Sequence, residues 1–317
     1  MNKRCDGLIL LPRLRVENAN AISGPLTWGF PSPTAFTGFT HALGRRFPHP
    51  EVTFDGVGVV CHAFDPQVYK PSKYHYRFSL ARHPVGKDGA PTGTVEEGRA
   101  HLEVSLIIGV FGYLDEDDGA ALARDLYKAA LGMRLAGGSI RPVPGNDRKY
   151  QPAYQPLAKN LESDRKAFRY FRRRLLPGFA LMSRQDLLIK HKEEMASRNP
   201  DATVFDALMD LVALHVNPEN TGDAETGQKT PWRYTRAKQG WLVPLPVGYG
   251  AIAPLAEPGA IKSARDQTVP FRFVESLCSL GEWVSPHHLH DPHEFLWFHR
   301  ADPEKGLYIV KQDNYSN

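Results

Sequence analysis

The clearest pattern in the chain is the alternation of apolar and polar residues along 99–110, which is typical of a strand with one buried face. The apolar positions are Ala100, Leu102, Val104, Leu106, Ile108 and Val110. Arg99, His101, Glu103 and Ser105 fall on the other face, which we expect to be polar and open to solvent. Arg99 and His101 are therefore candidates for contacts with a ligand on an open sheet face.

A second alternating segment covers residues 7–16, and residues 51–62 are also β-like. In the first of these, the apolar side is predicted to consist of Leu8, Leu10, Leu14 and Val16. Arg13 and Arg15 fall on the opposite side, so the pattern predicts a strand with a basic face.

Helical spacing follows each of the two alternating strands. After a charge-free, proline-rich loop over 18–31, Ser32 and Pro33 form a helix start, and the helix is predicted to end before Pro48. Asp115–Asp118 supply an acidic first turn for the second helix, which Gly137 and Gly138 are expected to end before a short closing strand.

The resulting order is strand, helix, strand, strand, helix, strand, which predicts an α+β chain with a ferredoxin-like, RRM-type core (βαββαβ). The insertion at 66–98 is rich in Lys, Arg and Tyr and is expected to form a projecting β-hairpin thumb. Residues 1–143 are predicted to form this core, and 144–317 a mixed α/β C-terminal region packed on it.

Three further helices are expected in the C-terminal region. They cover residues 161–175, a segment from the capping signature Ser183-x-x-Asp186 to about 197, and residues 203–216. Residues 217–230 are polar and are predicted to form a loop, and short β-like pieces follow from Trp232 onward.

Charge is unevenly distributed along the 317 residues, although the net charge is only +4. Residues 165–174 contain six basic residues and no acid, which suits a surface that faces a polyanion. Arg169, Arg172 and Arg173 are therefore candidate nucleic-acid contacts, with a solvated helix face as the alternative.

The three cysteines, Cys5, Cys61 and Cys278, are widely spaced and exclude a disulfide scaffold or a cysteine-rich zinc site. The apolar stretches 7–11 and 106–114 are too short to span a bilayer. We expect a cytoplasmic protein without membrane association.

The motifs of the common hydrolases and nucleotide-binding loops are missing from the sequence. We therefore assign no catalytic residue, no metal ligand and no cofactor. Five histidines between His287 and His299 match no closed four-ligand pattern, and a surface loop leading into Phe295–Phe298 is favoured over a metal site.

Several segments spread over the chain resemble one known family in the expected order. They are Glu17–Pro33, Glu96–Ser105, Met133–Ile140, Arg173–Ala180, Gly240–Pro246 and Lys305–Ile309. They are similar to the second subunit of the Csy complex, the type I-F CRISPR surveillance assembly (a Cascade-type ribonucleoprotein). The hairpin tip 84–93 and residues 143–165, 217–230 and 287–293 diverge.

The resemblance implies a non-catalytic subunit for antiviral defence. It implies an RRM-like core with a thumb, binding of the 5′ handle of the crRNA, and a heterodimer with the large subunit of the complex. It also implies contact with an adjacent backbone subunit, and it leaves open whether target double-stranded DNA is contacted.

For the handle site, our own candidates come from the residue chemistry. Asn18 and Asn20 follow the first strand, and their amides suit base edges, although they suit turns equally well. Trp28 suits stacking on a base or burial under the loop. Arg134, Gly137 and Gly138 suit close approach of a phosphate or a plain helix stop.

Two other hypotheses belong to different function classes. The first is a metal-independent endoribonuclease that processes CRISPR precursor RNA, with His41, His101 or Tyr74 as acid or base. The second is a metal-dependent hydrolase built on the histidines at 287–299.

Overall fold

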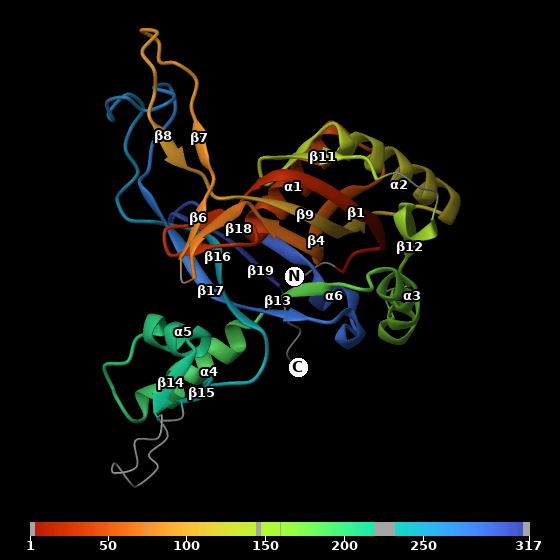
Figure 1. Ribbon diagram of the computed structural model, residues 1–317. Helices are drawn as coiled ribbons and strands as arrows, with labels where there is room; N and C mark the ends of the chain where they lie inside the picture. Colours follow the sequence, from red (N-terminus) through yellow and green to blue (C-terminus); the bar gives the residue numbers. More distant parts are fainter. Residues whose placement is uncertain (1–3, 74, 144–146, 159, 219–231, 313–317) are drawn as a thin grey trace. The chain divides into compact units, whose positions relative to one another are not determined.

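The computed structural model describes residues 4–73, 75–143, 147–158, 160–218 and 232–312 (Figure 1). The protein is a mixed α+β protein with a large antiparallel sheet, as the sequence predicts. It divides into two compact units, and the expected boundary after residue 143 falls inside the first of them. The first unit comprises Met1–Leu181, Pro246–Leu277 and Val284–Asn317, and the second comprises Met182–Leu245 and Cys278–Trp283.

In the first unit, the sheet is built around two long strands, β1 and β9, which pair with each other. The strand β11 lies on the other side of β1, and β4 lies on the other side of β9; all of these pairings are antiparallel. The short β10 extends the sheet beyond β11. The bounds are β1 Gly7–Asn20, β4 Thr53–Pro66, β9 Arg99–Phe111, β10 Arg134–Leu135 and β11 Gly138–Arg141.

The predicted facing of β1 is wrong, because a β-bulge at Pro12–Arg13 shifts the alternation by one residue. Leu10 pairs with Ile107, whereas Leu14 pairs with Val104, so the two leucines lie on opposite faces of the sheet. Arg13 has a left-handed φ of 50° and is 8% exposed. The strand therefore has no continuous basic face.

Two helices cover one face of this sheet, which we call the α face, while the other is called the second face. The α face carries Leu14 and Val104. Helix α1 packs on β4, and the ring of Tyr154 lies between Gly7 of β1 and Gly119 of α2. The bounds are α1 Pro33–Arg46 and α2 Glu116–Leu131.

Both helices begin where the sequence predicts, but the second does not end where it predicts. Ser32 caps α1 by accepting a hydrogen bond from the Thr34 N–H, and Asp115 caps α2. Helix α2 ends at Leu131, and a β-hairpin occupies 134–141, so the prediction that Gly137 and Gly138 end the helix is wrong.

The insertion at 66–98 consists of two short antiparallel ribbons that project from the sheet (Figure 1). Strand β5 pairs with β6, and β7 pairs with β8. The expected loop at 18–31 also contains a small hairpin of β2 and β3. The bounds are β2 Ile22–Gly24, β3 Thr27–Trp28, β5 Val68–Ser72, β6 His75–Phe78, β7 Leu80–Arg82 and β8 Thr94–Glu96.

The rest of the first unit covers part of the second face. A Cβ atom on Gly58 would collide with the ring of Phe295, and one on Gly109 would approach Leu296. Phe295 in turn packs against Phe168 of α3. The elements are η1 Arg148–Tyr150, β12 Ala153–Pro156, α3 Leu161–Arg174, η2 Pro286–His288, α6 Pro292–Phe295, β18 Trp297–Asp302 and β19 Leu307–Gln312.

Three further strands are β13 Phe179–Ser183, β16 Leu242–Ala251 and β17 Val274–Val284. Within the first unit, Phe179 and Ala180 of β13 pair with β4, and residues 248–250 of β16 pair with β19.

The second unit has its own small core. The buried side chains are Leu188, Ala207, Leu208, Leu211, Leu242 and Leu280. The predicted capping box at Ser183 is wrong, because α4 begins after Arg184 and has no side-chain cap. The helix predicted over 203–216 ends at Val212, and a strand follows. The bounds are α4 Gln185–Ala196, α5 Val204–Val212, β14 His215–Pro218 and β15 Trp232–Thr235.

The loop predicted over 217–230 lies outside the described residues from 219 onward. Among the described helices, none has both the length and the apolar character that crossing a membrane requires.

Candidate nucleic-acid interface

The Asn20 end of β1 brings most of the predicted handle residues together. Asn18 has a left-handed φ of 59° at a second bulge, between Val16 and Ala19, and its side chain is exposed. The backbone N–H of Asn20 donates to the carbonyl of Ala136 at 2.8 Å. The end of β1 therefore adjoins the hairpin that contains Arg134, because β11 is the direct neighbour of β1.

Asn18 and Asn20 differ in how far their amides are occupied. The Asn20 amide donates to the carbonyl of Ile22 at 2.7 Å and accepts from its N–H at 3.0 Å, which is an Asx turn. Asn18 Oδ1 accepts from the Gln67 amide, while its Nδ2 donates to no residue that the structure describes. Asn18 is therefore better placed to contact a ligand than Asn20.

Arg99 and His101 lie on the second face of β9, beside Asn18. His101 is half-buried, with Nε2 at 3.0 Å from Gln67 Nε2 and Nδ1 at 3.4 Å from the Asn18 backbone nitrogen. The Arg99 guanidinium pairs with Glu97 at 2.6 Å and donates to the Asn18 carbonyl at 3.3 Å. Gln67, which the sequence analysis missed, joins this group from the residue after β4.

Arg134, Gly137 and Gly138 belong to the β10–β11 hairpin. Ala136 and Gly137 have φ values of 48° and 77°, as a two-residue hairpin turn of type I′ requires. A Cβ on Gly138 would lie 2.7 Å from the Glu17 carbonyl, so this glycine permits close packing of two strands. Arg134 is exposed and donates to the Gly137 carbonyl at 3.2 Å.

Trp28 lies at the base of the thumb and is 55% exposed. Its ring meets Phe78 edge-on, with centroids 5.3 Å apart. One ring face of such a pair remains available for stacking on a base. Nearby, a shallow cavity of about 320 Å³ is lined by Asn20, Ile22, Glu96, Glu97, Gly98 and Arg99.

The arginines of α3 are separate from this group. Helix α3 packs on β12, η2 and α6, and β12 pairs with Gly7–Leu10 of β1. Ten residues of strand, about 33 Å, separate Leu8 from Asn18. Arg169 and Arg173 are exposed, whereas Arg172 donates to the Leu289 carbonyl at 3.0 Å. The structure therefore divides the predicted contacts into two regions.

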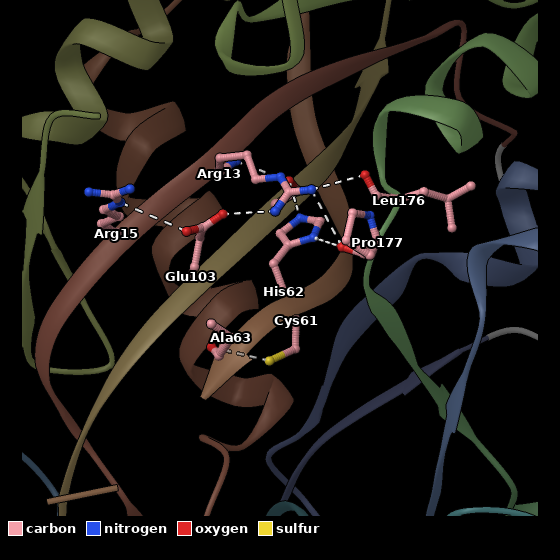
Figure 2. Close-up of polar contacts among 9 residues, drawn as sticks. Arg13, Arg15, Cys61, His62, Ala63, Glu103, Leu176 and Pro177 are labelled. Atoms are coloured by element: carbon pink, nitrogen blue, oxygen red, sulfur yellow. Dashed lines mark hydrogen bonds and ion pairs between the residues drawn. The ribbon is translucent and has the colours of Figure 1, made fainter. Parts of the chain in front are cut away.

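Between these regions, the second face carries a partly buried polar network (Figure 2). Arg13 donates to Glu103 at 2.8 Å and to the Leu176 carbonyl at 3.0 Å. His62 Nδ1 lies 2.7 Å from the Pro177 carbonyl, and its Nε2 lies 2.7 Å from Ser105 Oγ. A carbonyl oxygen only accepts, so Nδ1 carries the proton and Nε2 accepts from Ser105.

Burial lowers the pKa of His62 to about 4, with a smaller lowering by the Arg13 guanidinium that the Pro177 carbonyl opposes. Arg15 at the edge of the network is half-exposed and lies 3.8 Å from Glu103. Arg13 is buried, and His62 and Glu103 are partly buried, which is unusual for charged and titratable side chains. The alternation of polar residues along 99–105 indicated this surface, but not that Leu176 and Pro177 cover it.

The histidine-rich segment is a surface loop only in part, because His287, His288 and His290 are exposed but the residues that follow them are not. Asp291 and His293 are buried, and Phe295, Leu296 and Trp297 are completely buried. His293 Nδ1 lies 3.7 Å from Cys5 Sγ, and its Nε2 lies 3.5 Å from the buried Asp164. Within the described ranges, no group of three or more His, Cys, Asp or Glu side chains is arranged to hold a metal ion.

The acid and base candidates of the endoribonuclease hypothesis are not grouped. His41 is exposed on α1, where its ring stacks on His299 at 5.8 Å, and His101 belongs to the group around Asn18. Tyr74 lies outside the described residues.

The fold and this site define an α+β protein whose large sheet carries amides and cations at one exposed end, with an accessible tryptophan in the adjoining β2–β3 hairpin. The family model of CRISPR-associated protein Csy2 matches residues 9–310. The chain is 49% identical over 310 residues to the CRISPR-associated protein Csy2 of Pseudomonas aeruginosa (strain UCBPP-PA14), covering 96% of this chain and 94% of that protein. The chain therefore belongs to the Csy2 family of the type I-F CRISPR system.

Proposed function

We propose that this protein is a non-catalytic, cytoplasmic subunit of a type I-F CRISPR surveillance complex, that it binds the 5′ handle of the crRNA, and that it pairs with the large subunit. The observation that carries the proposal is the grouping of Asn18, Arg99, His101 and Arg134 at one end of β1. These residues come from three separate strands, and they combine base-edge chemistry with positive charge.

The strand order supports an RRM-type core as the framework for this site. The order β11-β1-β9-β4, with every neighbour antiparallel and with α1 and α2 on the α face, is the arrangement expected of a βαββαβ unit. In such a core the face opposite the helices binds RNA. Here much of that face is covered, so we place the RNA at its Asn20 end and along the thumb.

Pairing with a protein partner is supported by apolar side chains on the second unit. In α5, Val204, Phe205 and Met209 are each about half-exposed, and Leu214 and Val216, which follow in the chain, are exposed to a similar extent. Exposed apolar surface of this kind is typical of interfaces. The apolar segment Phe295–Phe298 does not offer such a surface, because its first three side chains are completely buried.

The test is competition between the cognate handle RNA and a scrambled RNA for the co-purified heterodimer. An amide that reads a base is worth about 1–3 kcal/mol against the wrong base. We expect Asn18→Ala combined with Asn20→Ala to lower the preference for the cognate handle about tenfold or more. Arg134→Ala is expected to weaken the binding of both RNAs, because it removes a positive charge.

Two controls make this assay decisive. Asn20→Asp keeps an acceptor for the Ile22 N–H, so it separates loss of the turn from loss of base reading. The RNA recovered from each reaction in EDTA is expected to be intact, since we propose no catalysis. Full preference for the cognate handle in the double variant, or cleavage of repeat RNA, would contradict the proposal.

A further inference from the structure

A second hollow, of about 440 Å³, lies where α1 ends and β4 begins. Its floor is apolar, formed by Phe47, Val52 and Phe54, and its rim carries His41, Arg45 and His49. It is distant from the RNA site proposed above. Thr53 pairs with Phe111 and Asp65 with His101, so about ten residues of strand, roughly 33 Å, separate the two along β9.

Gly44 of α1 forms part of the wall of the hollow. Gly44 has no left-handed φ, so the backbone does not require glycine there. A glycine inside a helix costs about 1 kcal/mol relative to alanine. A Cβ at this position would lie 3.4 Å from Phe54 Cδ2, and a larger side chain would therefore cover the phenylalanine ring. We infer that the space above Phe54 is what this glycine provides.

The rim of the hollow carries one cation, Arg45, and two imidazoles, and its side chains are held in place. His41 and Arg45 are both exposed and lie one helical turn apart on α1, on the same side as Gly44. The His41 ring stacks on His299, which itself stacks on Tyr308 at 6.2 Å. Both contacts keep the His41 imidazole at the rim.

His49 supplies a donor at the same rim. Its Nδ1 accepts from the Glu51 N–H at 3.2 Å, so in the neutral ring the proton is on Nε2. Glu51 is the neighbouring carboxylate, but none of the described residues that line the hollow carries one. A floor with two aromatic rings, beside one arginine and two imidazoles, fits a ligand that is flat at one end and anionic at the other.

We propose that this hollow binds one nucleotide of a single-stranded nucleic acid, with the base against Phe54 and Phe47 and the phosphate near Arg45 and His49. Base-on-aromatic stacking beside cations is the usual way in which single strands are bound without sequence preference. A base inside a duplex is paired and stacked on both sides, so it has no free ring face to insert. The site goes beyond the proposed handle binding, because it lies at the opposite end of the sheet.

The experiment uses the RNA-loaded complex and a photoreactive probe that is not complementary to the guide. One probe is an oligo-dT of about 12 nucleotides with 4-thiothymidine, and the other is its uridine counterpart with 4-thiouridine. Irradiation followed by mass spectrometry is expected to place crosslinks in residues 41–54. Comparison of the two probes distinguishes DNA from RNA as the source of the nucleotide.

Substitutions then test the geometry. Gly44→Leu fills the hollow, and Arg45→Glu reverses the rim charge without entering the core; each is expected to lower crosslinking about tenfold or more. Gly38→Leu is the matched control, because Gly38 is in the same helix and a Cβ there meets nothing within 4 Å. It is expected to leave crosslinking unchanged.

Handle competition is measured on the same variants and should not change, so failure of this site is distinguishable from failure of the handle site. Crosslinks confined to other segments, or undiminished in both Gly44→Leu and Arg45→Glu, would overturn the proposal. If the probes do not crosslink and Gly44→Leu instead releases a protein subunit from the complex, the hollow is a protein-docking site and the proposal is wrong.

Discussion

At the Gly7 end of β1, Leu8 and Leu10 point toward the second face of the sheet and are completely buried, together with Ile107 of β9. At the Asn20 end of the same ladder, that face carries Arg99 and His101, which are only half-buried. One face of one pair of strands is therefore hydrophobic core at one end and candidate RNA surface at the other.

The difference between the two ends arises from what covers them. Phe295 and Leu296 pack directly on Gly58 and Gly109, which have no Cβ to obstruct them. In the middle, Leu176 and Pro177 offer carbonyls to Arg13 and His62, so polar side chains there are satisfied by backbone rather than by water. Toward Asn20 these segments no longer cover the sheet, and Asn18 is exposed.

The largest contrast is expected from removing one aromatic ring at each end. Phe295→Ala should lower the free energy of unfolding by about 3–5 kcal/mol, because the ring is completely buried against Phe168. Trp28→Ala, at the exposed end, should change stability by less than about 1 kcal/mol and should weaken RNA binding. Chemical denaturation and handle binding measure the two effects.

The reverse outcome, a stable Phe295→Ala variant with impaired RNA binding, would show that the covered end opens in the complex. Phe295→Leu serves as the conservative control, since it restores most of the buried apolar surface.

A smaller effect is expected from acid, at the boundary between the two ends. The His62 pKa is about 4 in the folded chain and about 6.5 when unfolded. Between these values the unfolded state binds a proton that the folded state does not, so stability falls as pH falls from 6.5 toward 4. The slope contributed is about 1.4 kcal/mol per pH unit.

His62→Gln keeps a donor for Pro177 and an acceptor for Ser105 but does not titrate. The free energy of unfolding, measured at several pH values between 7 and 4.5, should therefore depend less steeply on pH for this variant than for the unmodified chain. Equal slopes for both proteins would mean that His62 is not the group that makes the network sensitive to acid.

The smallest expected effects are on α3, where the arginines differ in their contacts. Arg172→Ala should cost about 1–2 kcal/mol of stability, because its guanidinium hydrogen-bonds the Leu289 carbonyl. Arg169→Ala and Arg173→Ala should leave stability unchanged. If the helix contacts a polyanion, each should reduce the log–log salt dependence of nucleic-acid binding by about one unit.

Measured salt slopes that do not change for Arg169→Ala and Arg173→Ala would make this a solvated helix face. They would also restrict nucleic-acid binding to the Asn20 end and the hollow beside Gly44.

Local patterns in the sequence determined the strands at 7–16, 51–62 and 99–110, and both helices between them. Alternation and capping are properties of neighbouring residues, which is why the Ser32 and Asp115 caps were predictable. The end of α2 was not predictable, because Gly137 and Gly138 are equally suited to a helix stop and to the β10–β11 hairpin in which they lie.

The site was predicted in part for the same reason. Asn18, Asn20, Arg99 and His101 follow from strand order and alternation, and the adjacency of β11 to β1 adds Arg134. Gln67 was missed because nothing in its neighbours indicates a functional role. Of the histidines at 287–299, only His293 is buried, and its burial depends on Asp164 and Cys5, which are distant in sequence.

The sequence by itself thus determined the elements, their order and the family to which the chain belongs. Tertiary structure decided which face of each strand is core, since the bulge at Pro12–Arg13 reverses the facing of β1 as far as the second bulge, between Val16 and Ala19. It also decided which polar residues remain accessible, because residues 176–177 and 295–296 cover one part of the sheet and leave the end near Asn18 exposed.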